Sequence, residues 1–328
     1  MSRRSRANHS IVVANNDLGG ARTTKVQRKK ICKSFIEWCF ANGYPFNSIA
    51  DATLLMVQAY IKSLKEAGIS VATMHNRVAS IRRAMKALGN DPDVIGITAN
   101  SVGLEPRDRR GTKEPIPDAL LEIAIAKALE LDEPGFAIAL RLQRLLGHRG
   151  LESLMSIGDL EKYAIEARCQ LVDTRISITK GTKGGRPRVT DVIHARAGET
   201  LQTIQEALVY MRTHGFLVEG GKSGLKSARS KYHRLAADVG LVGKYSPHSL
   251  RYAFAVEKIT ELRDQGFNRK ETLSLVAKFL GHGESRNRYV SQVYGQTVVH
   301  TVPIEKRKTR LERAIKNVGK LLDGTIRA

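Results

Sequence analysis

A histidine and an arginine in H-x-x-R spacing mark the stretch of this sequence with the most groups able to do chemistry. Ser246-Pro247 is typical of a helix start, because a polar residue caps exposed amides and proline's fixed φ suits the first turn. His248 and Arg251 then project from one face of that turn. A titratable imidazole would therefore lie beside a permanent planar cation.

A second group of polar residues follows at the turn after the next expected helix. His282 stands in an L-G-H turn, and Tyr289 and Tyr294 come downstream of it. A phenol has an ordinary pKa of about 10, so it needs cations or a base nearby to act as a nucleophile. The two groups together predict a pocket for a phosphate and a phenolic nucleophile.

Two further pieces of such a pocket lie upstream. RLLGHRGLESL places Arg149 and Glu152 three residues apart at the end of an apolar helical segment. GTKGGRPRV places Lys183 in a glycine-rich turn between two strand-like runs, which predicts a β-hairpin. Lys180 lies on the same expected hairpin and is an alternative to Lys183.

The order of these motifs resembles the tyrosine recombinases, the phage-integrase family, over residues 115 to 300. Members share G-x-R-x-x-E, a hairpin lysine, H-x-x-R, L-G-H and a terminal tyrosine, in that order. The resemblance implies cleavage of DNA without metal or nucleotide cofactor, through a 3′-phosphotyrosyl link and a free 5′ hydroxyl. It implies these catalytic residues: Arg149, Lys183, His248, Arg251, His282 and Tyr294.

The resemblance also implies a role for each of these residues. Arg149 and Arg251 would grip the two non-bridging phosphate oxygens, and His282 would hydrogen-bond the phosphate. Lys183 would protonate the leaving 5′ oxygen, and His248 would assist proton transfer at the tyrosine.

The sequence departs from the family pattern in two places. The interval from His282 to Tyr294 is longer than usual, and Tyr289 lies nearer. VSQVYG is similar to the family's V-T-x-x-Y, which favours Tyr294 as the nucleophile. VTDV stands where the family usually has V-P-L after the hairpin.

The charge balance indicates a polyanionic partner. The 328 residues include 54 Lys+Arg against 32 Asp+Glu, a formal net charge of +22, and duplex DNA is the natural candidate. No lipidation motif or membrane-length apolar run is present, and the basic start is followed by no signal-like apolar core. Cys32, Cys39 and Cys169 fit no zinc pattern, so we expect no metal. Cys32 and Cys39 fall on an apolar helical stripe with Phe35, so we expect both to be buried thiols. Free thiols are typical of a reducing compartment, and we expect a bacterial cytoplasmic, nucleoid-associated protein.

The expected fold is mainly α with a small antiparallel β-sheet. We expect a basic flexible arm over 1–20, a helical core-binding domain over 21–106, a linker over 107–117 and a catalytic domain over 118–302. A basic amphipathic helix over 303–328, with Leu311, Ile315, Val318 and Leu322 as its apolar stripe, would dock on its own domain or be exchanged between protomers. Basic residues predicted to contact DNA are Lys29, Lys30, Arg77, Arg82, Arg83, Lys180, Arg186, Arg229 and Lys231.

The sequence therefore predicts a site-specific DNA recombinase, the integrase of a mobile genetic element, acting as a homotetramer on two DNA sites. Two alternatives remain open. A type IB topoisomerase shares the arginine, lysine, histidine and tyrosine set but acts as a monomer. A DNA-binding accessory protein on the same fold would not form a covalent complex with DNA.

Overall fold

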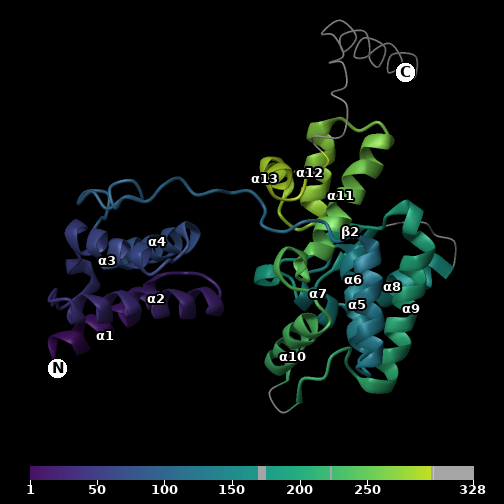
Figure 1. Cartoon of the computed structure of the whole chain (residues 1–328), viewed down its shortest axis with the longest axis horizontal. Helices are drawn as coiled ribbons and strands as arrows, with labels where there is room; N and C mark the ends of the chain where they lie inside the picture. The colour runs from purple at the N-terminus through teal and green to yellow at the C-terminus, as the bar shows by residue number, and fades with distance from the viewer. Residues whose placement is uncertain (169–174, 222–223, 297, 299–328) are drawn as a thin grey trace, which may run out of the picture. The chain divides into compact units, whose positions relative to one another are not determined.

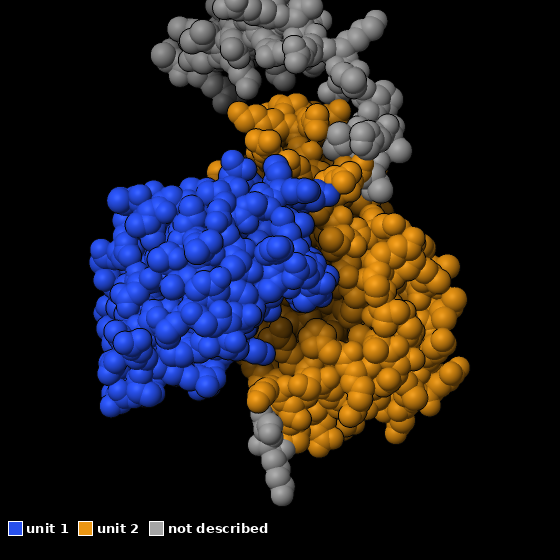
Figure 2. All heavy atoms as spheres, turned by 60° about the vertical axis from the view of Figure 1, so that its left-hand side comes forward, with its two compact units in different colours: residues 1–109 blue, residues 110–328 orange. Residues whose placement is uncertain are grey.

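The structure is a computed structural model that describes residues 1–168, 175–221, 224–296 and 298. The chain divides into two compact units, Met1–Arg109 and Arg110–Ala328, which Figure 2 draws in blue and orange. The described residues are mainly helical, with one two-stranded antiparallel sheet. The predicted fold class is confirmed.

The first unit is a helical module around one apolar core. Its helices are α1 (Arg3–Asp17), α2 (Arg22–Ala41), α3 (Leu54–Glu66) and α4 (Val71–Ala87), with a 3-10 turn at Ile49–Asp51. The side chains of Thr53 and Ser70 accept backbone N–H groups at the starts of α3 and α4, as capping residues do. Phe35 and Tyr60 pack edge to face within the core.

The prediction of a flexible arm over residues 1–20 is wrong. Most of that stretch is α1, whose start is capped by Ser2. Ala7, Ile11 and Ala14 are buried along one face of this helix, against α2 and α4. Two alanines and one isoleucine make a narrow stripe, and the surrounding basic and polar residues hide its helical period.

The second unit begins with a group of helices around a larger core. They are α5 (Asp118–Glu130), α6 (Pro134–Leu146), α7 (Gly150–Met155) and α8 (Ile157–Arg168), followed after the hairpin by α9 (Ala197–His214) and α10 (Leu225–Asp238). Helix α6 is buried almost throughout and packs against α5, α7, α9 and α11 (Figure 1). It therefore forms a rigid support for the turn that follows it.

A β-hairpin lies between α8 and α9, as the sequence predicts. Strand β1 (Arg175–Ile178) pairs antiparallel with β2 (Arg188–Asp191), so that Ile178 faces Arg188 across the ladder. A 3-10 turn at Lys183–Gly185 occupies the connection. Strand β2 also contacts α12, which brings the hairpin to the C-terminal helices of the unit.

The C-terminal helices form a second core beside the first. They are α11 (His248–Asp264), α12 (Arg269–Phe279) and α13 (Asn287–Val293). Short 3-10 turns precede α11 at Gly243–Tyr245 and α13 at Glu284–Arg286, and another precedes α9 at His194–Arg196. Phe254, Val276, Leu280 and Val290 are fully buried in this core. The core fixes α13, and with it Tyr294, which follows α13, against α11 and α12.

The connector predicted over 107–117 crosses the boundary between the units. From Gly111 onward it pairs with the second unit, where the N–H of Gly111 donates to the carbonyl of Gln292 at 3.3 Å. The N–H of Glu114 donates to the carbonyl of Lys244, also at 3.3 Å. This half of the connector is therefore bound to the second unit.

The structure describes two of the three cysteines and none of the predicted C-terminal helix. Cys32 and Cys39 are buried free thiols, and burial raises the pKa of each to about 12. Cys169 and the predicted C-terminal helix over 303–328 lie outside the described residues. Within the described ranges, the helices are all too short or too polar to cross a bilayer.

Candidate active site

Arg149 begins the site at the turn between α6 and α7. Gly147 closes α6 with φ +59°, and a Cβ there would lie 2.5 Å from the Phe254 ring, so glycine is required on two counts. The next residues then start α7, with Arg149 as its N-cap. The carboxylate of Glu152 accepts the Arg149 backbone N–H at 2.8 Å and its guanidinium at 2.6 Å. This local ring holds the arginine in one orientation.

Arg251 lies in the first turn of α11 and is fully buried. Its two terminal nitrogens donate to the carbonyls of Gly147 and Leu280. Its third donor, Nε, points at the hydroxyl of Tyr294 at 3.5 Å. The Arg149 side chain, which is 22% exposed, is therefore the arginine with the more open access to a ligand.

Tyr294 is the residue on which the site converges. It follows α13, its side chain is 2% exposed, and Nε2 of His282 lies 3.2 Å from its hydroxyl. Tyr289 lies on α13 with 37% of its surface exposed, and its ring packs on His282 with centroids 4.8 Å apart. The hydroxyl of Tyr294, which also contacts Arg251, is thus the better placed of the two to meet a phosphate held by these cations.

His248 and His282 flank the tyrosine as neutral imidazoles. Burial lowers the pKa of His282 to about 3, and the charges of Arg251, Arg149 and Lys183 add to this effect. Desolvation lowers the pKa of His248 to about 4, and the charges of Arg251 and Arg149 add to this effect. A neutral imidazole can accept a proton, which suits the role predicted for His248.

The hairpin presents both candidate lysines to solvent. The backbone of Lys180 is tied to Asp159 of α8 at 3.0 Å. Gly181 follows with φ +72°, and a Cβ there would lie 2.5 Å from the carbonyl of Leu151, so the hairpin closes on α7. Lys183 is one of the charges that depress the pKa of His282, and this electrostatic contact links the hairpin turn to the site.

One buried cation of the site was missed from the sequence. Arg188 of β2 has a side chain only 2% exposed and donates from Nε and a terminal nitrogen to Glu152, at 3.2 and 2.8 Å. Arg188 lies in the predicted hairpin, but the alternation of side chains along a strand does not tell which face of the hairpin will be buried. Its isolated position in RPRV carried no signal of its burial.

The carboxylate of Glu152 forms ion pairs with Arg149, Arg188 and Arg251. Burial alone would raise the pKa of Glu152, but the charges of Arg188 and Arg251 outweigh it and lower the pKa to about 2. Burial lowers the pKa of Arg149, and it lowers that of Arg188 to about 10. The cluster of Arg149, Arg188 and Arg251 around Glu152 therefore has an excess of positive charge, as an anion-binding site requires.

The residues predicted to contact DNA differ in their freedom to do so. Those that are exposed are Lys29, Lys30, Arg83, Lys180, Arg186 and Arg229. Arg82 and Lys231 are instead paired with Asp93 and Glu133, both at 2.5 Å. Arg77 donates to the hydroxyl of Tyr60 at 2.5 Å. These three contribute first to the packing of their own units, and contact with DNA stays a prediction for all nine.

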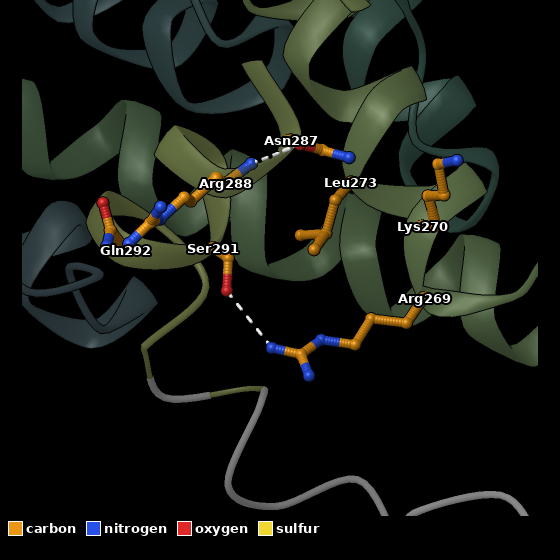
Figure 3. Close-up of a pocket in the computed structure, with 7 residues that line it drawn as sticks. All are labelled: Arg269, Lys270, Leu273, Asn287, Arg288, Ser291 and Gln292. Carbon is orange, nitrogen blue, oxygen red and sulfur yellow. Dashed lines mark hydrogen bonds between the residues drawn. The ribbon is translucent and has the colours of Figure 1, made fainter. Parts of the chain in front are cut away.

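A separate pocket of about 450 Å³ lies between α12 and α13 (Figure 3). Its lining includes Arg269, Leu273 and Arg288, and the guanidinium of Arg269 donates to Ser291 at 3.4 Å. None of the predicted catalytic residues lines it. Among the described residues no cluster of histidine, cysteine and carboxylate side chains could hold a metal ion.

Comparisons with known proteins agree with this arrangement. The family model described as phage integrase, N-terminal, matches residues 3–93, and the model described as integrase matches residues 103–257. Together they span most of the chain. The fold and the site define an enzyme of DNA cleavage and rejoining, and the chain belongs to the phage-integrase family of tyrosine recombinases.

Solved structures share the fold at low sequence identity. The XerH site-specific recombinase bound to palindromic difH substrate is 15% identical, with a TM-score of 0.58 over 91% of this chain and 94% of that one. The Tn1549 transposon integrase in complex with transposon right end DNA is 14% identical, with a TM-score of 0.55 over 92% and 99%. A lambda integrase tetramer bound to a Holliday junction is 15% identical, with a TM-score of 0.53 over 88% and 77%. No curated protein sequence matches the chain.

Proposed function

We propose that this chain is a site-specific DNA recombinase that serves as the integrase of a mobile genetic element. The observation that carries the proposal is the position of the Tyr294 hydroxyl, 3.2 Å from His282 and 3.5 Å from Nε of Arg251. A phenolic oxygen lies there beside a guanidinium and an imidazole, a combination that suits attack on a phosphate.

The proposed cleavage step conserves the phosphodiester bond energy. The Tyr294 oxygen attacks phosphorus and forms a 3′-phosphotyrosyl ester, while the bond from phosphorus to the 5′ oxygen breaks. The phenol proton passes to His248, and Lys183 gives a proton to the departing 5′ oxygen. Arg149 and Arg251 neutralise the charge that grows on the non-bridging oxygens. Rejoining reverses each transfer.

Lys183 is preferred over Lys180 as the general acid. Lys183 lies in the turn at the end of the hairpin and acts electrostatically on His282, whereas the Lys180 backbone is tied to Asp159. An exposed lysine at the end of a hairpin can approach the duplex, and it needs no metal ion to supply a proton.

The active assembly we propose is a homotetramer on two DNA sites, in the bacterial cytoplasm and associated with the nucleoid. The lambda integrase tetramer on a Holliday junction supports this stoichiometry by analogy of fold. The helical unit of residues 1–109 and the catalytic unit would each contact duplex DNA, consistent with the charge of +22.

A trapped covalent complex tests the proposal. The full chain first selects duplexes from a randomised pool. A selected duplex is then nicked near the cleavage point, so that the short 5′-hydroxyl strand diffuses away and the phosphotyrosyl product accumulates. We expect a slow band on a denaturing gel. No band from any selected duplex would contradict the enzyme and favour an accessory DNA-binding protein.

Strand exchange separates the recombinase from a type IB topoisomerase. Two selected duplexes with different labels are incubated with the chain. A recombinase yields products that carry both labels, whereas relaxation of supercoiled plasmid without exchanged products would identify a topoisomerase.

A further inference from the structure

Arg188 links the hairpin to two other elements of the site. At one edge of its guanidinium, Nε and a terminal nitrogen donate to Glu152 of α7. The other terminal nitrogen donates to the carbonyl of Phe279, the last residue of α12, at 2.5 Å. Nε and both terminal nitrogens of Arg188 already donate to protein acceptors, whereas Nε of Arg251 points at the Tyr294 hydroxyl. An effect of Arg188 on the reaction would therefore pass through these contacts.

The first contact leads to Arg149. One carboxylate oxygen of Glu152 accepts from Arg188 at 2.8 Å and from the backbone of Arg149 at 2.8 Å, and the other accepts the Arg149 guanidinium at 2.6 Å. The carboxylate thus bridges a buried arginine and a partly exposed one. Without Arg188, Glu152 would be free to shift, and Arg149 would shift with it.

The second contact leads to His282. The carbonyl of Phe279 ends α12 three residues before His282, and the turn continues through Gly281 with φ +65°. A Cβ at Gly281 would lie 2.9 Å from Cδ of Arg188, so the glycine leaves room for the arginine stem. Arg188 therefore packs directly under the turn that carries the histidine.

We propose that Arg188 is a positioning residue for strand cleavage. It acts through Glu152 to hold Arg149 in place for the phosphate, and through the Phe279 carbonyl to hold the turn of His282. The inference rests on the proposed function, and it assigns the third arginine of the cluster a task distinct from binding DNA. The planar guanidinium of Arg188 is suited to this task, because it donates hydrogen bonds to the Glu152 carboxylate and the Phe279 carbonyl at the same time.

The test compares two scissile groups in single-turnover covalent trapping. One nicked duplex, selected by the full chain, carries an ordinary phosphodiester, and its twin carries a methylphosphonate, which lacks one negative charge. We expect Arg188→Met to slow trapping about 100-fold on the phosphodiester, as a displaced catalytic group does. Most of that defect should vanish on the methylphosphonate, because less charge then has to be neutralised by a well-placed Arg149.

Two further variants separate positioning from folding. Arg188→Lys keeps the charge but loses the fork, so it should recover only part of the rate. Glu152→Gln combined with Arg188→Met removes both charges of the buried pair, so it avoids an unpaired buried charge and should fold. Its rate should be no lower than that of the slower single variant, because the two residues act in series.

Arg144→Met is the matched control. Arg144 is also a buried arginine, and its side chain pairs with Asp118 at 3.0 Å and Glu257 at 2.6 Å, which are not part of the site. It should lower thermal stability and leave the ratio of the two trapping rates at the wild-type value. Equal slowing of both substrates by Arg188→Met would overturn the positioning role. Absence of trapping by the wild-type chain would instead overturn the proposed function and the inference with it.

Discussion

His282 and Tyr294 are joined by a hydrogen bond of 3.2 Å across twelve residues of sequence. The 3-10 turn at Glu284–Arg286 and the short helix α13 fold the chain back between them. The interval that is long for the family is therefore taken up by a compact turn and helix, and the tyrosine still reaches the site. The ring of Tyr289, which lies on α13, has its centroid 4.8 Å from that of His282 and 6.2 Å from that of Tyr294.

The choice of nucleophile is tested by two single substitutions. Tyr294→Phe should abolish the covalent band, while it lowers stability by only about 1 kcal/mol for the lost hydroxyl contacts. Tyr289→Phe removes the same hydroxyl from an exposed ring and should keep the band. Denaturing gels and thermal unfolding measure the two effects. A band that survives in Tyr294→Phe and disappears in Tyr289→Phe would reverse the assignment.

Loss of Arg149 should impair chemistry far more than binding. Arg149→Ala removes the partly exposed cation that faces a ligand, so trapping should slow by about 10²–10³-fold, as when an oxyanion donor is lost. Affinity for the duplex should change little, because we expect many other basic residues to contact the phosphate backbone. Gel-shift titration beside single-turnover trapping checks this. A parallel loss of affinity and rate would show that Arg149 serves binding alone.

The general acid is tested with a sulfur leaving group. Lys183→Ala should slow cleavage of the ordinary duplex, but it should matter much less when the 5′ oxygen is replaced by sulfur, since a thiolate leaves without a proton. Lys180→Ala is the matched control on the same hairpin and should show no such rescue. If the rescue occurs in Lys180→Ala instead, Lys180 is the acid.

Stability should fall in mild acid because of buried histidines. Burial and the charge of Arg188 lower the pKa of His148 to about 3, and among the described residues neither of its ring nitrogens has a hydrogen-bond partner. In the unfolded chain the His148 imidazole binds a proton near pH 6.5, whereas in the folded protein it stays neutral until the pH is much lower. The free energy of unfolding should therefore decrease as pH falls from about 7 toward 3, by up to about 1.4 kcal/mol per pH unit for each such histidine.

Denaturant unfolding at several pH values measures this slope. His148→Asn cannot titrate in that range, so it should flatten the curve below pH 6.5 relative to the wild type. An identical slope in the wild type and His148→Asn would contradict the assigned origin.

Duplex binding should depend steeply on salt. With a formal charge of +22, contacts to phosphate should dominate affinity. Raising salt from about 50 to about 200 mM should weaken binding by about 10³-fold or more if several phosphates are neutralised. Fluorescence anisotropy with a selected duplex measures this. A flat dependence would rule out binding that is dominated by contacts to phosphate.

Much of the site could be predicted because its residues sit in short motifs with their own local structure. His248 and Arg251 share a helical turn, and Glu152 lies one turn from Arg149, so spacing alone places each pair. The hairpin followed from β-branched runs around a glycine-rich turn. These are local consequences of the chain, and they need no knowledge of distant contacts.

Other features depended on contacts between distant segments. The burial of α1 could not be predicted, because its weak apolar face gains a partner only when α2 and α4 have folded. The role of Arg188 likewise required Glu152 and Phe279 to approach it, 36 and 91 residues away. A polar residue on a short strand gives no local sign of which face will be covered.

The sequence by itself determined the order of the reactive groups, the class of fold and the charge that favours DNA. Only the tertiary structure decided which arginine remains partly open, which tyrosine meets Arg251 and His282, and which cation lies beneath them. The reason is physical: helical and hairpin spacing act over a few residues, whereas desolvation and ion pairing depend on whatever the folded chain packs around a group.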